Sequence, residues 1–184
     1  MKNLEVLATA AVAVLVLATA AYFSLRPSGS PTDSATKMKL VEEFYQDRLN
    51  FRAQEGRAIP ELPFTKSFLE LIDMNAKLCK EKTPDEVCGF GADGDVYLAA
   101  QDWANDLRFE NSGFKIEMGG DDVVVSFDLF HGDAWGQEQN RRTLKFNLIR
   151  EDGDWKVNDI VYVHPPGSTA RIQTEAEIKF LSGL

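Results

Sequence analysis

The stretch that decides the fold is TLKFNLIREDGDWKVNDIVYV, residues 143–163. Apolar and polar side chains alternate on both sides of Asp152-Gly153, as they do in half-buried β-strands. An Asp-Gly pair between two alternating runs indicates a tight hairpin turn. The alternation skips a step at Asn158-Asp159, which predicts a β-bulge in the second strand. The sequence therefore predicts an antiparallel hairpin here.

Two further strands are expected before this hairpin. Phe114, Ile116 and Met118 alternate with polar residues, and the same period returns in residues 123–129. Gly119-Gly120-Asp121 between them has the composition of a turn. The prediction is an antiparallel meander of about four strands.

Nearer the N-terminus, the apolar residues follow a helical period. This spacing predicts a helix over Thr36–Gln54, a second helix capped by Thr65, and a third over Val96–Leu107. Capping-box spacings predict a short helical turn at Thr83–Glu86 and a final helix starting at Thr174. Because helices and strands are segregated along the chain, the expected class is α+β, with the N-terminal helices packed on one face of a curved sheet.

An apolar run precedes this domain. Val6–Leu25 contains no charged residue and is long enough to cross a bilayer. Residues 1–26 are therefore interpreted as a cleaved signal peptide or as a single transmembrane anchor, residues 27–36 as a linker, and residues 37–184 as the domain. The expected location is the inner membrane facing the periplasm, or the periplasm itself if the leader is removed.

Charge and cysteine content limit the partners and cofactors. The formal net charge of −9 argues against binding to nucleic acid. Cys79 and Cys88, the only two cysteines, are expected to form a disulfide in an oxidising compartment. Two thiols and two distant histidines do not make a zinc set, and no cofactor motif is present, so neither a metal nor a cofactor is expected.

Two segments carry a resemblance to a known fold. DGDVYLAAQDW, residues 93–103, resembles a helix signature of an uncharacterised bacterial envelope family with the nuclear transport factor 2-like fold. GDWKVNDI, residues 153–160, is similar to the final-hairpin signature of many members of that fold. The resemblance implies a bent sheet wrapped around an N-terminal helix and a location in the envelope. It implies no established activity.

Four residues are candidates for binding. Asp102 would border the mouth of the cone if residues 96–107 form a helix, although a structural hydrogen bond that fixes this helix to the sheet is the favoured interpretation. His131, Asp133 and Trp135 lie in a glycine-containing loop between two predicted strands. Loop tips on a rigid sheet often carry recognition, and tryptophan is frequent at binding hot spots. Asp95 is expected to cap a helix rather than to bind calcium.

Three functional hypotheses follow. The first is a non-enzymatic envelope domain that binds a protein or a small ligand, including an inhibitor or immunity role against a basic toxin. The second is a structural subunit, because the architecture resembles the bitopic assembly subunit of type IV secretion systems. The third is an isomerase or dehydratase of the same fold, with Asp102 as the residue to test.

Overall fold

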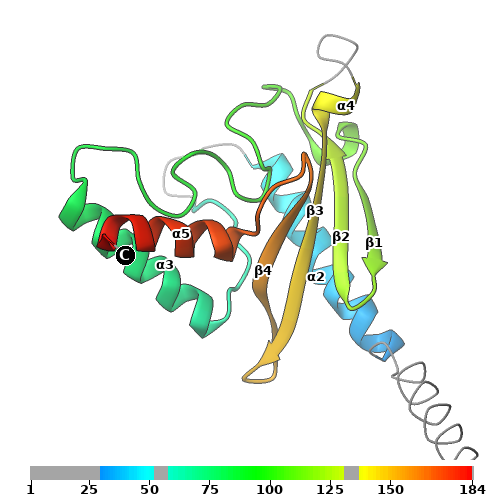
Figure 1. Ribbon diagram of the computed structural model, residues 1–184. Coiled ribbons are helices and arrows are strands. Elements are labelled where there is room, and N and C mark those ends of the chain that lie inside the picture. The colour runs from blue at the N-terminus through cyan, green and yellow to red at the C-terminus, as the bar shows by residue number, and fades with distance from the viewer. Residues whose placement is uncertain (1–29, 52–57, 131–136, 184) are drawn as a thin grey trace, which may run out of the picture. The chain divides into compact units, whose positions relative to one another are not determined.

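A computed structural model describes residues 30–51, 58–130 and 137–183. The chain divides into two units, Met1–Ser30 and Pro31–Leu184. The second unit is an α+β domain, as predicted (Figure 1). Its elements are α2 (Pro31–Asn50), α3 (Lys66–Lys82), the 3₁₀ turn η1 (Phe109–Asn111), β1 (Lys115–Gly119), β2 (Asp122–Asp128), α4 (Gln137–Asn140), β3 (Arg141–Glu151), β4 (Asp154–His164) and α5 (Ala170–Ser182).

The four strands form one antiparallel sheet in the order β1-β2-β3-β4. Asp152 and Gly153 join β3 to β4 with φ angles of 55° and 92°, the positive values that a tight hairpin turn requires. Asn147 pairs with Asp159 whereas Leu148 pairs with Val157, so Asn158 is the extra residue of a bulge. The hairpin and its bulge are therefore confirmed.

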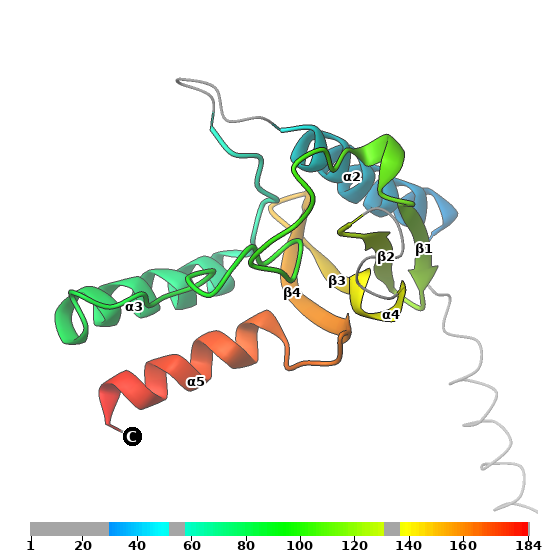
Figure 2. The ribbon, with the colours of Figure 1, turned by 90° about the horizontal axis from the view of Figure 1, so that it is seen from above.

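Helix α2 covers one face of this sheet (Figure 2), and buried side chains fill the space between them. Tyr45 of α2 is fully buried, and its ring centroid lies 5.3 Å from that of Phe127 and 6.0 Å from that of Phe146. The alternating residues of the strands point into the same core, as their period predicted. The core residues from α2, from the strands and from the residue after β2 are Val41, Phe44, Tyr45, Leu49, Val123, Val125, Phe127, Leu129, Leu144, Phe146, Leu148, Val157 and Ile160.

Helices α3 and α5 lie side by side next to β4 (Figures 1 and 2). The predicted cap is confirmed, because the Thr65 hydroxyl accepts a hydrogen bond from the Phe68 N–H at the start of α3. Thr65 N–H also donates to Val157 O at 3.0 Å, and Val157 N–H donates to Pro63 O at 2.8 Å. These bonds occupy backbone groups on the outer edge of β4 and fix α3 to the sheet.

Two helical predictions are wrong. Residues 96–107 form turns and loop, because Asp95 and Ala100 exchange backbone hydrogen bonds and Ala99 has a φ of +49°, which no α-helix contains. Thr83–Glu86 forms a single hydrogen-bonded turn, in which Glu86 N–H donates to Thr83 O at 3.1 Å, but it opens no helix. Instead Thr83 closes α3, with its N–H and its hydroxyl both donating to Cys79 O.

The ends of two other helices differ from the prediction. Helix α2 begins at Pro31 rather than Thr36, so residues 31–36 of the expected linker are helical. Proline fits the first turn of a helix because its missing N–H has no partner to lose there. Helix α5 begins at Ala170 and is capped by Thr169. Thr174 lies inside the helix, where its hydroxyl donates a hydrogen bond to Ala170 O.

The expected disulfide is present between Cys79 and Cys88, and it ties the last turn of α3 to the loop that follows. None of the helices among the described residues is long and apolar enough to span a membrane. The apolar run Val6–Leu25 lies outside those residues.

Candidate functional site

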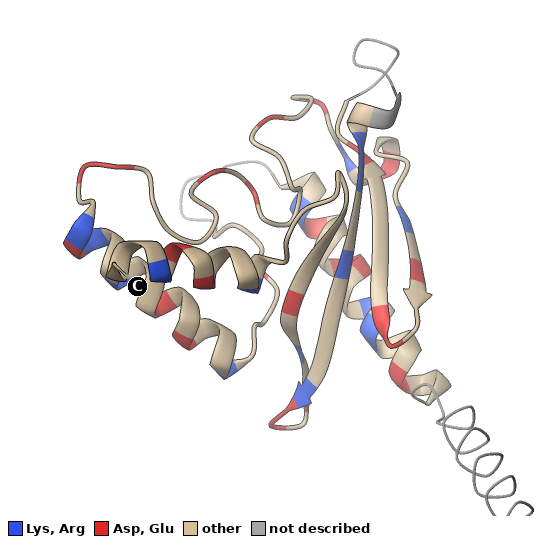
Figure 3. Cartoon of the chain, viewed as in Figure 1, with Lys and Arg blue, Asp and Glu red and all other residues tan. Residues whose placement is uncertain are grey.

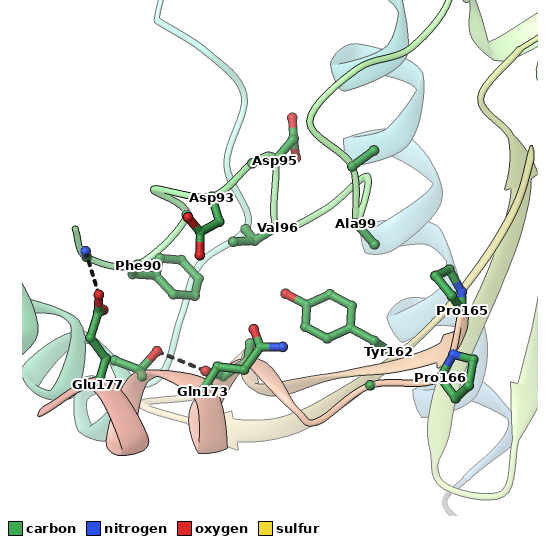
Figure 4. Close-up of a pocket in the computed structure, with 17 residues that line it drawn as sticks. Phe90, Asp93, Asp95, Val96, Ala99, Tyr162, Pro165, Pro166, Gln173 and Glu177 are labelled. Carbon is green, nitrogen blue, oxygen red and sulfur yellow. Dashed lines mark hydrogen bonds between the residues drawn. The ribbon is translucent and has the colours of Figure 1, made fainter. Parts of the chain in front are cut away.

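A pocket of about 480 Å³ lies between loop 89–100 and the junction of β4 with α5 (Figure 4). Phe90, Asp93 and Val96 line it from the loop, and Tyr162, Pro165 and Gln173 line it from the opposite side. Its volume falls within the range of roughly 300–1,000 Å³ that is typical of small-ligand sites. The pocket is separate from the filled space between α2 and the sheet.

The loop wall of the pocket is organised by Asp95. Its Oδ1 accepts hydrogen bonds from the N–H groups of Tyr97 and Leu98, at 2.9 and 3.1 Å. Its Oδ2 forms an ion pair with Arg48 of α2, and the Asp95 side chain is only 5% exposed. Asp95 therefore caps a turn, not the helix that the sequence predicted, and calcium would have to displace Arg48.

Further contacts hold this wall from α2 and β3. The Tyr45 hydroxyl donates to Tyr97 O at 2.6 Å, and Arg142 Nε donates to Ala99 O at 3.1 Å. A Cβ at Gly94 would lie 2.7 Å from Ala100 O, so only glycine allows the loop to close so tightly. The positive φ of Ala99 is maintained by these surrounding bonds, and such strained backbone occurs preferentially at functional sites.

The opposite wall of the pocket carries the hydroxyl of Tyr162. The Tyr162 side chain points into the pocket (Figure 4), and its hydroxyl makes no hydrogen bond with the described residues. Burial raises the pKa of Tyr162 above its usual value, and the nearby carboxylates of Asp159 and Asp95 raise it further. The phenol is therefore protonated at neutral pH, and it can donate one hydrogen bond and accept another.

The pocket is acidic. Asp93 is exposed, and it makes neither a hydrogen bond nor an ion pair with the described part of the chain. Glu177 of α5 accepts hydrogen bonds from Gly89 N–H at 3.3 Å and from Asn75 Nδ2 at 2.9 Å. Residues 83–107 contain six acidic residues and no Lys or Arg (Figure 3). No lysine or arginine is among the described residues that line the pocket.

The binding residues expected from the sequence either lie away from the pocket or fall outside the residues that the structure describes. Asp102 lies on an exposed loop, where its Oδ1 accepts a hydrogen bond from the neighbouring Trp103 N–H, and it does not line the pocket. Its expected place on a helix at the mouth of the cone was wrong because that helix does not form. His131, Asp133 and Trp135 lie outside the described residues.

Sequence reasoning missed Tyr162 and Gln173 because the pocket joins segments more than 60 positions apart. Two signals were available. Gly89, Gly91 and Gly94 indicated an irregular loop, and Pro165-Pro166-Gly167 indicated a sharp turn after the last strand. Neither signal shows that the two segments face each other.

No known protein family, no curated protein and no solved structure matches this chain. The chemistry of the pocket residues is therefore the basis for assigning a function.

Proposed function

We propose that this domain binds a small ligand in the pocket between loop 89–100 and the β4–α5 junction. The observation that carries the proposal is a preformed pocket of about 480 Å³ whose loop wall is fixed by Asp95, Arg48, Tyr45 and Arg142. A wall held in this way loses little conformational freedom when a ligand binds, which favours affinity.

The lining defines the class of ligand. Asp93 and the Tyr162 hydroxyl offer hydrogen-bond acceptors, and Phe90, Val96 and Pro165 offer apolar surface. Because no lysine or arginine among the described lining residues balances the acidic groups, an anionic ligand would be repelled. The best fit is a small molecule with an apolar body and a protonated amine.

The cellular setting is also a proposal. Residues 1–26 would export the domain or anchor it in the envelope, and the Cys79–Cys88 disulfide suits an oxidising compartment. The placement of α2 against an antiparallel sheet is compatible with the nuclear transport factor 2-like resemblance. The mass of the mature protein would show whether residues 1–26 have been removed or remain as an anchor.

A basic protein is a second candidate ligand. The absence of Lys and Arg from residues 83–107 favours it, because an acidic surface attracts a basic partner and accelerates its association. This candidate includes the inhibitor or immunity role. The isomerase or dehydratase hypothesis gains no support from Asp102, which is exposed and lies outside the pocket.

Binding of phenethylamine to the full chain in mild detergent tests the small-ligand proposal. Calorimetry should detect the amine and not the corresponding neutral alcohol. Tyr162→Phe and Asp93→Asn should each weaken binding by about tenfold, the value of one hydrogen bond to a charged group. Asp102→Asn is the matched control and should bind as the wild type does.

The same variants also report on folding. Tyr162→Phe should leave the free energy of unfolding nearly unchanged, because the hydroxyl has no partner among the described residues to lose. Equal affinity of the wild type and both pocket variants for the amine would remove the pocket as the binding site.

A further inference from the structure

A group of potential metal ligands lies beside the pocket. The sulfur atoms of Cys79 and Cys88 and a carboxylate oxygen of Glu177 lie within 4.8 Å of one another. They come from the last turn of α3, the loop after it, and α5. In this structure the two sulfurs are bonded to each other, so they cannot bind a metal in this state.

The surroundings of the group are those of a partly buried site. Cys79 is 6% exposed, and Glu177 is half-buried with no ion pair to any described residue. Asn75 Nδ2 and Gly89 N–H hold both carboxylate oxygens of Glu177 in place. Hydrogen-bonded carboxylates of this kind are typical of metal sites, where an outer group orients the ligand.

A second observation points to a missing group at the same place. Asn75 is fully buried, and its Oδ1 has no hydrogen-bond partner among the described residues, whereas its Nδ2 lies 3.9 Å from Cys79 Sγ. A buried oxygen without a donor is costly and calls for an explanation. A water molecule bound to a metal at Cys79 would supply such a donor.

We propose that the reduced form of this domain binds Zn²⁺ through the Cys79 and Cys88 thiolates and the Glu177 carboxylate. A water molecule in the fourth position would donate a hydrogen bond to Asn75 Oδ1. Three protein ligands and one water are a common tetrahedral zinc arrangement, and thiolate and carboxylate ligands both occur in such sites.

Reduction of the disulfide requires a two-electron reductant, such as a dithiol. The dithiol transfers two electrons and two protons to the disulfide, gives two cysteine thiols and becomes a disulfide itself. Zinc then displaces one proton from each thiol, so binding releases two protons. Disulfide and zinc site are alternative states of one cysteine pair.

The sulfur atoms of the reduced cysteines must move apart before both can bind one zinc ion. Two sulfurs on one tetrahedral zinc are separated by about 3.8 Å, given a zinc–sulfur distance of about 2.3 Å. Cys88 is placed for this movement, because residues 84–87 before it are exposed. Cys79 and Glu177 remain fixed by the packing of α3 against α5. This proposal does not depend on what the pocket binds.

Zinc titration of the full chain tests the proposal, with a chromophoric chelator as competitor. The chain is reduced with a phosphine, because added thiols would themselves bind zinc. One equivalent should bind to the reduced wild type and none to the oxidised chain. Glu177→Gln should weaken binding by about tenfold or more, whereas Glu175→Gln, an exposed neighbour on α5, should not.

Cobalt in place of zinc should give thiolate-to-metal charge-transfer absorption in the wild type and lose it in Cys88→Ser. Circular dichroism of each sample reports whether the domain is folded. The proposal is overturned if the reduced chain binds no zinc, if Glu177→Gln binds as tightly as the wild type, or if the reduced chain is unfolded and zinc does not refold it.

Discussion

A single carboxylate, Asp95, organises the wall of the candidate pocket. It accepts two backbone hydrogen bonds and pairs with Arg48, which also donates to Pro60 O at 3.2 Å. Arg48 and Asp95 are 15% and 5% exposed, so their charges are largely removed from water. In such a pair, loss of one partner leaves an uncompensated buried charge.

We predict that Arg48→Ala destabilises the domain by about 3 kcal/mol, because it leaves the Asp95 carboxylate buried without a cation. Chemical denaturation of the full chain measures this change. Lys39→Ala is a control on the same helix, since the Lys39–Glu43 pair is exposed and should contribute less than about 0.5 kcal/mol. Asp95→Asn in the Arg48→Ala background should recover part of the loss, and a further loss would contradict the ion-pair explanation.

A second prediction concerns the tyrosines. Burial raises the pKa values of Tyr45, Tyr97 and Tyr162 above the usual value of about 10. A raised pKa means that the folded state favours the neutral phenol. The resulting stability is complete below pH 10 and is lost as the pH rises further, by about 1.4 kcal/mol per pH unit for each tyrosine.

Tyrosinate absorption measures this effect directly. The three buried phenols should not ionise near pH 10 in the folded chain, and they should ionise together when alkaline unfolding occurs. Gradual ionisation of all four tyrosines near pH 10 while the circular dichroism stays native would contradict the prediction.

At the scale of elements, the period of the apolar residues predicted the strands correctly but not every helix. The alternation in β2, β3 and β4 fixed their buried faces, and the skipped step at Asn158 located the bulge. Residues 96–107 also had a helical period, and Asp95 accepts from the N–H groups of Tyr97 and Leu98 as a helix cap would. The backbone nevertheless folds back, because Asp95 and Ala100 exchange hydrogen bonds and Ala99 has a positive φ. A periodic pattern cannot reveal such a closed turn.

Helix ends were predicted less well than helix faces. The capping-box spacing at Thr174 suggested a start that the structure places at Ala170, after Thr169. Thr169 has the same side chain but no glutamate three positions on, so it lacks the capping-box spacing that marks Thr174.

The cap itself is testable. Thr169→Ala should destabilise the domain by about 1 kcal/mol, because the Ile172 N–H loses the acceptor that Thr169 Oγ1 provides at 3.2 Å. Thr169→Ser should retain nearly all of the stability. Thr36→Ala, within α2 and exposed, should change it by less than about 0.5 kcal/mol. Urea denaturation compares the three variants, and equal stability of Thr169→Ala and the wild type would reject the cap.

At the scale of the whole domain, contacts between distant segments of the chain create the pocket and the proposed zinc site, which no local sequence pattern shows. The pocket joins residues 89–100 to residues 162–177, and the ligand group proposed for zinc joins α3, a loop and α5. Only the disulfide among these links was predicted, because cysteine pairing in an oxidising compartment needs no knowledge of the fold. Glu177 beside that disulfide required the structure.

The disulfide should stabilise the whole domain by about 2–3 kcal/mol, since it closes a loop over nine positions in the unfolded chain. Urea denaturation of the oxidised wild type and of the Cys79→Ala/Cys88→Ala variant, both with a chelator present, measures this value without interference from zinc. Hydrogen exchange should increase at residues 84–94, which the bond fastens to α3, and should stay unchanged in β2 and β3. Equal stability of the two proteins would mean that Glu177 and the packing of α3 against α5 already hold this loop, and that the bond adds no constraint.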